Sequence, residues 1–174
     1  MAAMRDTLTD APAGVWPEEP ASGSALAGWI ALTVGGGSIL GAWTNGGADP
    51  WYVALDKAPW NPPAWVFAPV WTTLYVLMAL AAWFVWRRGG WRHQSRALTL
   101  FVLQLTLNFA WSPLFFVARQ PGLALLDLVA LWMLVVWTMR AFARVQPLAS
   151  WLLAPYLAWV TYAATLNLWV VIRN

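Results

Sequence analysis

Cysteine is absent from the sequence, and histidine occurs once, as His93. Without cysteine the chain forms no disulfide and has no thiolate to act as a nucleophile or to bind a metal. One histidine is too few for the clusters of histidine and cysteine that hold zinc. We therefore expect no metal site and no required cofactor, and we identify no catalytic residue.

Charged residues are scarce as well: they make up 10% of the chain, whereas apolar residues make up 61% and the mean hydropathy is +0.58. A soluble domain has about 25% charged and about 45–50% apolar residues. The balance therefore indicates a membrane protein, and the length of 174 residues suggests one domain. The net charge of +3 comes from arginines between apolar runs, which is typical of topology signals and not of nucleic-acid binding.

Residues 1–24 lack the apolar core that follows the basic tip of a secretory signal. The segment instead combines Arg5 with four acidic residues and three prolines. This composition predicts a disordered tail on the solvent side, followed by one domain at 25–174.

Five apolar runs approach the roughly 20 residues that a helix needs to cross a bilayer core. They lie at 25–43, 64–86, 97–117, 122–143 and 150–172. The predicted fold class is therefore all-α, an integral membrane bundle of five transmembrane helices. Short links, such as the polar stretch 87–96, join the last four runs and make successive helices antiparallel. The first link, 44–63, is long and rich in proline, glycine and tryptophan, so we interpret it as an ordered lid over a pocket.

Lysine and arginine predict the orientation in the membrane. With five crossings, the basic residues divide seven to three between the two faces. On the side of the N-terminus lie Arg5, Arg87, Arg88, Arg92, Arg96, Arg140 and Arg144, and on the other side lie Lys57, Arg119 and Arg173. Since cytoplasmic loops are enriched in these residues, we expect a cytoplasmic N-terminus and an outer C-terminus, in a bacterial cell membrane.

Polar side chains in two of the runs repeat every four residues, so each set lies on one helix face. One stripe holds Gln104, Asn108 and Ser112 beside Trp111 and Phe115, and the other holds Trp159, Ala163 and Asn167. Such amides can join membrane helices, at about 0.6 kcal/mol per hydrogen bond. They can equally orient a ligand in a pocket lined by rings, and the small side chain of Ala163 leaves room for one.

Two further patterns in the apolar runs have both a functional and a structural interpretation. Asp127 lies in the fourth run, where a carboxylate is a functional candidate, although a structural role near the interface is the alternative. Gly37 and Gly41 form a G-x-x-x-G pattern, which permits close helix packing either in a dimer or within one chain.

The stretch 60–71 contains the start of the second span. Asn61 stands where an N-cap would, and the two prolines after it suit a first helical turn. Pro69 lies further along and is expected to kink the helix. The tryptophans expected to gather at this membrane face are Trp51, Trp60 and Trp65.

Three long motifs follow one another along the chain. They are W-Y-V-A-L-D-K-A-P-W-N-P-P-A-W-V-F-A-P-V-W-T-T-L-Y-V-L-M at 51–78, Q-L-T-L-N-F-A-W-S-P-L-F-F-V-A-R-Q-P-G-L-A-L-L-D-L at 104–128 and P-Y-L-A-W-V-T-Y-A-A-T-L-N at 155–167. Together they resemble the tryptophan-rich sensory protein / translocator protein family, also called peripheral-type benzodiazepine receptors. The resemblance extends from about residue 51 to residue 173.

This resemblance implies a five-helix bundle, often a homodimer, that binds porphyrins such as protoporphyrin IX and haem. Some members bind sterols or benzodiazepine-type drugs, although Leu168 stands where animal members carry the tyrosine of a cholesterol motif. The family's pocket lies beneath the first loop, and its lining falls here on Trp51, Asn108, Trp111, Phe115, Trp159, Ala163 and Asn167. Asp127 matches the fourth-helix aspartate of the family, and Trp65 at the start of the second run completes the predicted ligand-binding set.

The function we predict is a membrane-embedded binding protein or sensor for planar apolar ligands, above all tetrapyrroles. The expected partners are such a ligand, membrane lipid and a second copy of the chain. Transport of tetrapyrroles and light-dependent porphyrin degradation are the alternatives, and a purely structural membrane subunit is the remaining interpretation.

Overall fold

The computed structural model describes residues 23–44 and 49–174, so nearly all of the predicted N-terminal tail lies outside the described residues. The described part of the chain is helical and contains no strand. Its α-helices are α1 (Gly23–Ile30), α2 (Gly36–Thr44), α3 (Pro50–Ala54), α4 (Phe67–Trp86), α5 (Gly90–Ser112), α6 (Pro121–Val145), α7 (Pro147–Leu152) and α8 (Ala154–Arg173). A 3₁₀ turn at Ala64–Val66 precedes α4, and π-helical turns at Ala31–Gly35 and Pro113–Val117 follow α1 and α5.

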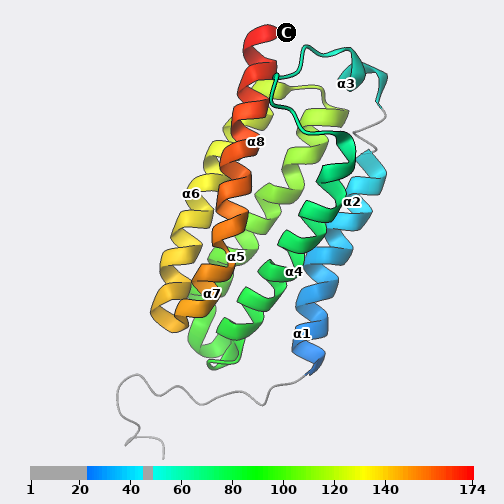
Figure 1. The fold of residues 1–174 in the computed structure, drawn as a ribbon. Coiled ribbons are helices and arrows are strands. Elements are labelled where there is room, and N and C mark those ends of the chain that lie inside the picture. The colour runs from blue at the N-terminus through cyan, green and yellow to red at the C-terminus, as the bar shows by residue number, and fades with distance from the viewer. Residues whose placement is uncertain (1–22, 45–48) are drawn as a thin grey trace, which may run out of the picture.

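Five of the resulting segments are long and apolar enough to cross a membrane, which confirms the predicted fold class. They are Gly23–Thr44, Ala64–Trp86, Gly90–Val117, Pro121–Val145 and Pro147–Arg173. Figure 1 shows them side by side in one bundle, with α3 at the end where α8 finishes and α7 at the other end. We call the segment 49–63, which carries α3, the lid, and the two ends of the bundle the lid end and the opposite end.

The third span starts earlier than the sequence suggests. The predicted polar link at 87–96 is already helical from Gly90 on, except at Gln94, whose non-helical dihedrals (φ −115°, ψ 23°) mark a kink between the first turn of α5 and the rest of the helix. Gly89 has a φ of 104°, a left-handed conformation that glycine adopts without a steric penalty. The chain therefore reverses within one short turn, and the polar residues that follow it form the first turns of α5.

Prolines shape the helix ends differently from what their spacing suggests. Asn61 does not cap α4, which begins six residues later at Phe67; its amide donates instead to the carbonyl of Pro62 at 3.0 Å. Pro69 is the third residue of α4, a place in the first turn where a missing N–H costs no helical hydrogen bond, so the kink at this residue stays a prediction. Pro113 opens a π-helical turn, and Pro155 stands in the first turn of α8.

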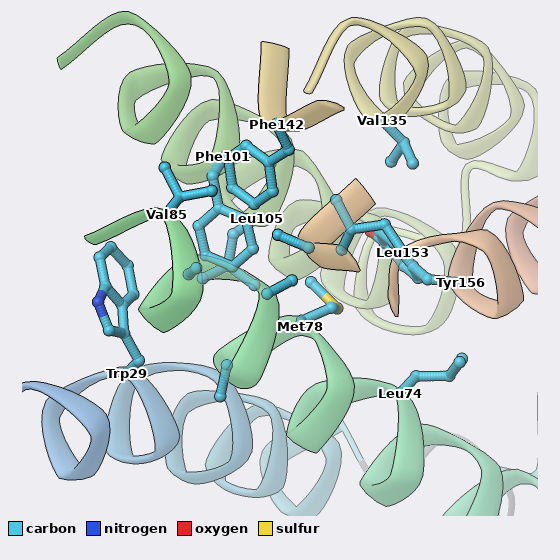
Figure 2. Packing of buried hydrophobic residues seen from close by; sticks show 14 of the residues in the cluster. Trp29, Leu74, Met78, Val85, Phe101, Leu105, Val135, Phe142, Leu153 and Tyr156 are labelled. Atoms are coloured by element: carbon cyan, nitrogen blue, oxygen red, sulfur yellow. The ribbon is translucent and has the colours of Figure 1, made fainter. Parts of the chain in front are cut away.

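The bundle is packed solid in the half away from the lid. Figure 2 shows this core, in which the rings of Phe101 and Phe142 stack at 5.9 Å and Trp29 meets Phe101 edge-on at 5.4 Å. Met78 and Val85 of α4 are fully buried between them. Lipid chains are as apolar as these side chains, so close van der Waals packing, and not exclusion of water, holds this half together.

The first span is attached to α4 through small residues. The Thr33 hydroxyl donates to the backbone carbonyl of Tyr75 at 3.0 Å. A side chain at Gly37 would collide with the Tyr75 ring, whereas one at Gly41 would meet nothing within 4 Å. Close packing within one chain therefore accounts for Gly37.

Candidate ligand-binding cavity

A cavity of about 790 Å³ lies between the spans beneath the lid. This volume falls within the range of about 300–1,000 Å³ that small-molecule sites occupy. Its wall comes from α2, the lid, the lid-side halves of α4 and α5, and parts of α6 and α8. Its lining includes Tyr52, Lys57, Phe67, Trp71, Tyr75, Asn108, Trp111, Phe115, Leu131, Trp159, Ala163 and Asn167.

Two groups of rings belong to this wall. On α4, Trp71 stacks on Tyr75 at 5.4 Å, and Trp159 of α8 meets Trp71 edge-on at 6.5 Å. Trp111 of α5 stacks at 5.1 Å on Phe115, which belongs to the π-helical turn that follows α5. Offset and edge-on pairs are the arrangements that aromatic quadrupoles favour. The rings therefore hold one another in place and leave apolar surface toward the cavity.

The two predicted amides have different surroundings. Asn108 is 6% exposed and accepts a hydrogen bond from the Tyr75 hydroxyl at 2.9 Å. Asn167 has both ends occupied: its oxygen accepts from Trp111 Nε1 at 3.1 Å, and its nitrogen donates to the carbonyl of Pro121 at 2.8 Å. Asn167 thus joins α8 to α5 and α6, which is the helix-joining role that the sequence left open.

Six of the nine predicted ligand-binding residues line the cavity together: Asn108, Trp111, Phe115, Trp159, Ala163 and Asn167. Trp51, Trp65 and Asp127 do not belong to the lining. Trp51 packs behind it, edge-on against Phe115 at 5.6 Å, and Trp65 is 73% exposed at the start of the second span. Asp127 is only partly buried on α6, one position before Leu128, which does line the cavity.

The sequence reading missed one wall of the cavity, the series Phe67, Trp71 and Tyr75 on α4. These residues are four apart, so their spacing predicts one helix face. The signal was therefore present, but the same stretch reads equally well as an aromatic belt at the membrane interface.

The lid is folded by its own side chains. Asp49 caps α3 by accepting from the backbone N–H of Trp51 at 2.8 Å. Burial raises the pKa of the Tyr52 hydroxyl above its usual value, and a hydrogen bond with Asn61 lowers it in part. Tyr52 therefore stays protonated at neutral pH and lines the cavity as an uncharged phenol.

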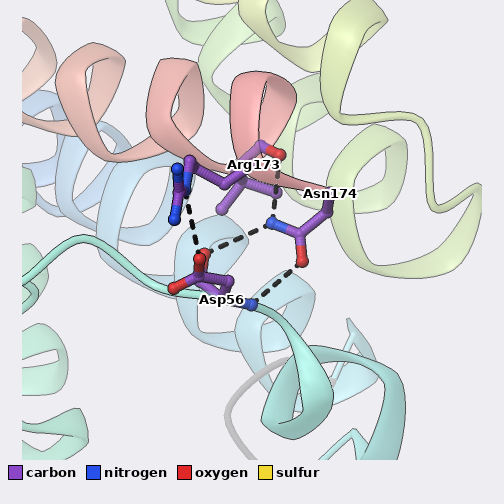
Figure 3. Close-up of polar contacts among 4 residues, drawn as sticks. Asp56, Arg173 and Asn174 are labelled. Atoms are coloured by element: carbon purple, nitrogen blue, oxygen red, sulfur yellow. Dashed lines mark hydrogen bonds and ion pairs between the residues drawn. The ribbon is translucent and has the colours of Figure 1, made fainter.

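The lid is also attached to the end of α8, as Figure 3 shows. Asn174 accepts from the backbone N–H of Asp56 at 2.9 Å and donates to its carbonyl at 3.2 Å, and Arg173 pairs with the Asp56 carboxylate at 3.2 Å. Further along the lid, Trp60 meets Trp169 edge-on at 5.2 Å. The same helix thus carries Trp159 in the wall and fixes the cover above it.

We predict that Asn174→Ala loosens the lid. The substitution removes both hydrogen bonds to the Asp56 backbone, so the Asp56 amide should exchange with solvent several-fold faster, as an amide opened by local unfolding does. Hydrogen exchange by mass spectrometry of the lid measures this. Ile172→Ala is the matched control, because Ile172 is 70% exposed at the same helix end. Equal exchange in the wild type and in Asn174→Ala would show that the attachment does not hold the lid.

Residues 23–44 and 49–174 contain no cluster of three or more histidine, cysteine, aspartate or glutamate side chains that could hold a metal ion. His93 stands in the first turns of α5, at the opposite end of the bundle from the cavity. His93 is therefore not among the residues that line the cavity.

Comparison with known proteins agrees with this architecture. The model of the TspO/MBR family matches residues 29–173. The chain is 44% identical over 134 residues to the translocator protein of Bos taurus, covering 75% of this chain and 79% of that protein. It is 41% identical over 150 residues to the tryptophan-rich protein TspO of Chlorobaculum tepidum, covering 86% of this chain and 95% of that protein.

The family match covers most of the first transmembrane segment and all of the other four, and it includes every residue named above as lining the cavity. Spans and relatives together show an integral, multi-pass membrane protein with a role in ligand binding or transport. The resemblance seen in the three sequence motifs is thereby confirmed, and the chain belongs to the TspO/MBR family.

Proposed function

We propose that this protein binds planar apolar molecules, above all tetrapyrroles such as protoporphyrin IX and haem, in the cavity beneath its lid. The observation that carries the proposal is the wall of that cavity, in which Trp71 and Trp159 meet on one side and Trp111 and Phe115 stack on another. Flat conjugated molecules gain most from such rings by offset stacking.

We predict that Trp159→Ala weakens the binding of protoporphyrin IX. One aromatic contact contributes about 0.5–1.5 kcal/mol beyond the area it buries, so the dissociation constant should rise about fivefold. Titration of purified protein, followed by the porphyrin absorption band, measures this without depending on the number of tryptophans left. Trp151→Ala is the control, because Trp151 is 74% exposed on α7 at the opposite end. Equal affinity in the wild type and Trp159→Ala would remove Trp159 from the site.

Transport of the same ligands is the second candidate function. It is favoured by two π-helical turns: Ala31–Gly35 interrupts the first span, and Pro113–Val117 ends the third span and contributes Phe115 and Phe116 to the cavity lining. Such turns recur at functional sites because they weaken regular helical pairing. Porphyrin flux into proteoliposomes tests it: uptake that Trp159→Ala slows would support transport through this cavity, and saturable binding without flux would limit the protein to binding.

A further inference from the structure

The cavity has an uneven charge. Among the described residues that line it, Lys57 of the lid is the one that carries a full charge at neutral pH, and none of them is a carboxylate. The remaining polar groups there are hydroxyls and amides, such as those of Tyr75 and Asn108. The aromatic lining of the cavity is thus accompanied by one positive charge, that of Lys57, on the side of the lid.

The other cations of the lid end are already neutralised. Arg119 pairs with Asp49 at 3.6 Å, and Arg173 pairs with Asp56 at 3.2 Å. These pairs use both carboxylates that the described part of the lid contributes. Lys57 therefore has no carboxylate partner among the described residues.

The geometry of Lys57 leaves room for one anionic partner. Its ammonium donates to the carbonyls of Val53 at 3.0 Å and Leu55 at 3.3 Å, and lies 4.8 Å from the centre of the Tyr52 ring. An ammonium has three N–H donors, so two hold it in place at the end of α3 and one remains. The side chain is thus positioned by the lid before any ligand arrives.

From this geometry we infer that Lys57 binds a carboxylate of the ligand, which makes the natural guest an apolar ring system with an acidic edge that points toward the lid. This inference rests on the proposed function and narrows it. A single charge of this kind matches a carboxylate, since the lining holds no second cation to balance a doubly charged phosphate. Neutral ring systems would use the same wall but gain nothing from Lys57.

The test compares protoporphyrin IX, which carries two carboxylates, with its uncharged dimethyl ester. In the full chain, Lys57→Met keeps the aliphatic stem and removes the charge, so the affinity for the diacid should fall about fivefold, the size expected for a half-exposed charge pair. The affinity for the ester should stay the same, and Lys57→Arg should restore diacid binding. Arg119→Met, which removes a cation outside the lining, is the matched control and should leave both affinities unchanged.

The outcomes separate this inference from the proposed function. An unchanged diacid affinity in Lys57→Met, or an equal loss for diacid and ester, would overturn the role of Lys57, because the second result assigns the lysine to lid folding alone. If Arg119→Met lowered the diacid affinity as much as Lys57→Met does, the role of Lys57 would be overturned too. The general positive potential of the lid end would then explain both losses. Failure of both compounds to bind the wild type would overturn the proposed function itself and this inference with it.

Discussion

Replacing Gly37 by alanine should lower the affinity for protoporphyrin IX about tenfold, because the added methyl group displaces the Tyr75 ring from the cavity wall, and an aromatic contact contributes about 0.5–1.5 kcal/mol beyond the area it buries. The new carbon would meet the Tyr75 ring. That ring cannot move freely, since it stacks on Trp71 at 5.4 Å and its hydroxyl donates to Asn108 at 2.9 Å. Displacing it therefore disturbs one wall of the cavity and the partner of Asn108 together.

The measurement is the same porphyrin titration, accompanied by a thermal melt in detergent to confirm that the variant is folded. Gly35→Ala is the matched control, because a side chain there meets nothing within 4 Å and Gly35 does not line the cavity. Wild-type affinity in a folded Gly37→Ala protein would show that the α2–α4 contact does not shape the site.

Replacing Asn167 by leucine, which has a similar size, should lower the free energy of unfolding by about 2–3 kcal/mol. Asn167 is 2% exposed and satisfies two groups from other helices, the indole N–H of Trp111 and the carbonyl of Pro121. Leucine leaves both without a partner, and a buried group without one costs more than the bond contributed. Thermal unfolding in one detergent at fixed concentration measures the effect.

Replacing Gln104 by methionine should change the free energy of unfolding in the opposite direction from Asn167→Leu. Gln104 is 1% exposed, and neither atom of its amide has a hydrogen-bond partner among the described residues. Methionine has nearly the same shape without the polar groups, so it should raise the free energy of unfolding by about 1 kcal/mol. Destabilisation equal to that of Asn167→Leu would show that the Gln104 amide makes a stabilising contact with bound water.

The number of spans and the family could both be predicted from the sequence. Each span depends on the apolar content of about 20 consecutive residues, which is a local property. Each of the three family motifs between Trp51 and Asn167 is likewise one continuous stretch of sequence. Six lining residues were also found, since spacing by four places Trp159, Ala163 and Asn167 on one face. These features need no knowledge of what a helix packs against.

Only the tertiary structure decided which of these residues line the cavity, which of them connect helices and which face outward. Trp51 and Trp65 read as part of the same cluster as Trp60, but one packs behind Phe115 and the other faces outward. The sequence gives Asn108 and Asn167 the same two possible roles. Only the hydrogen bonds of Asn167 to Trp111 of α5 and to Pro121 of α6 show that it connects three helices. Lys57 likewise is the one cation among the described residues that line the cavity only because the fold places it against the wall and leaves Arg119 and Arg173 outside the lining, each paired with an aspartate of the lid. Hydropathy acts along one helix, whereas the role of a side chain depends on neighbours that the fold brings from elsewhere in the chain.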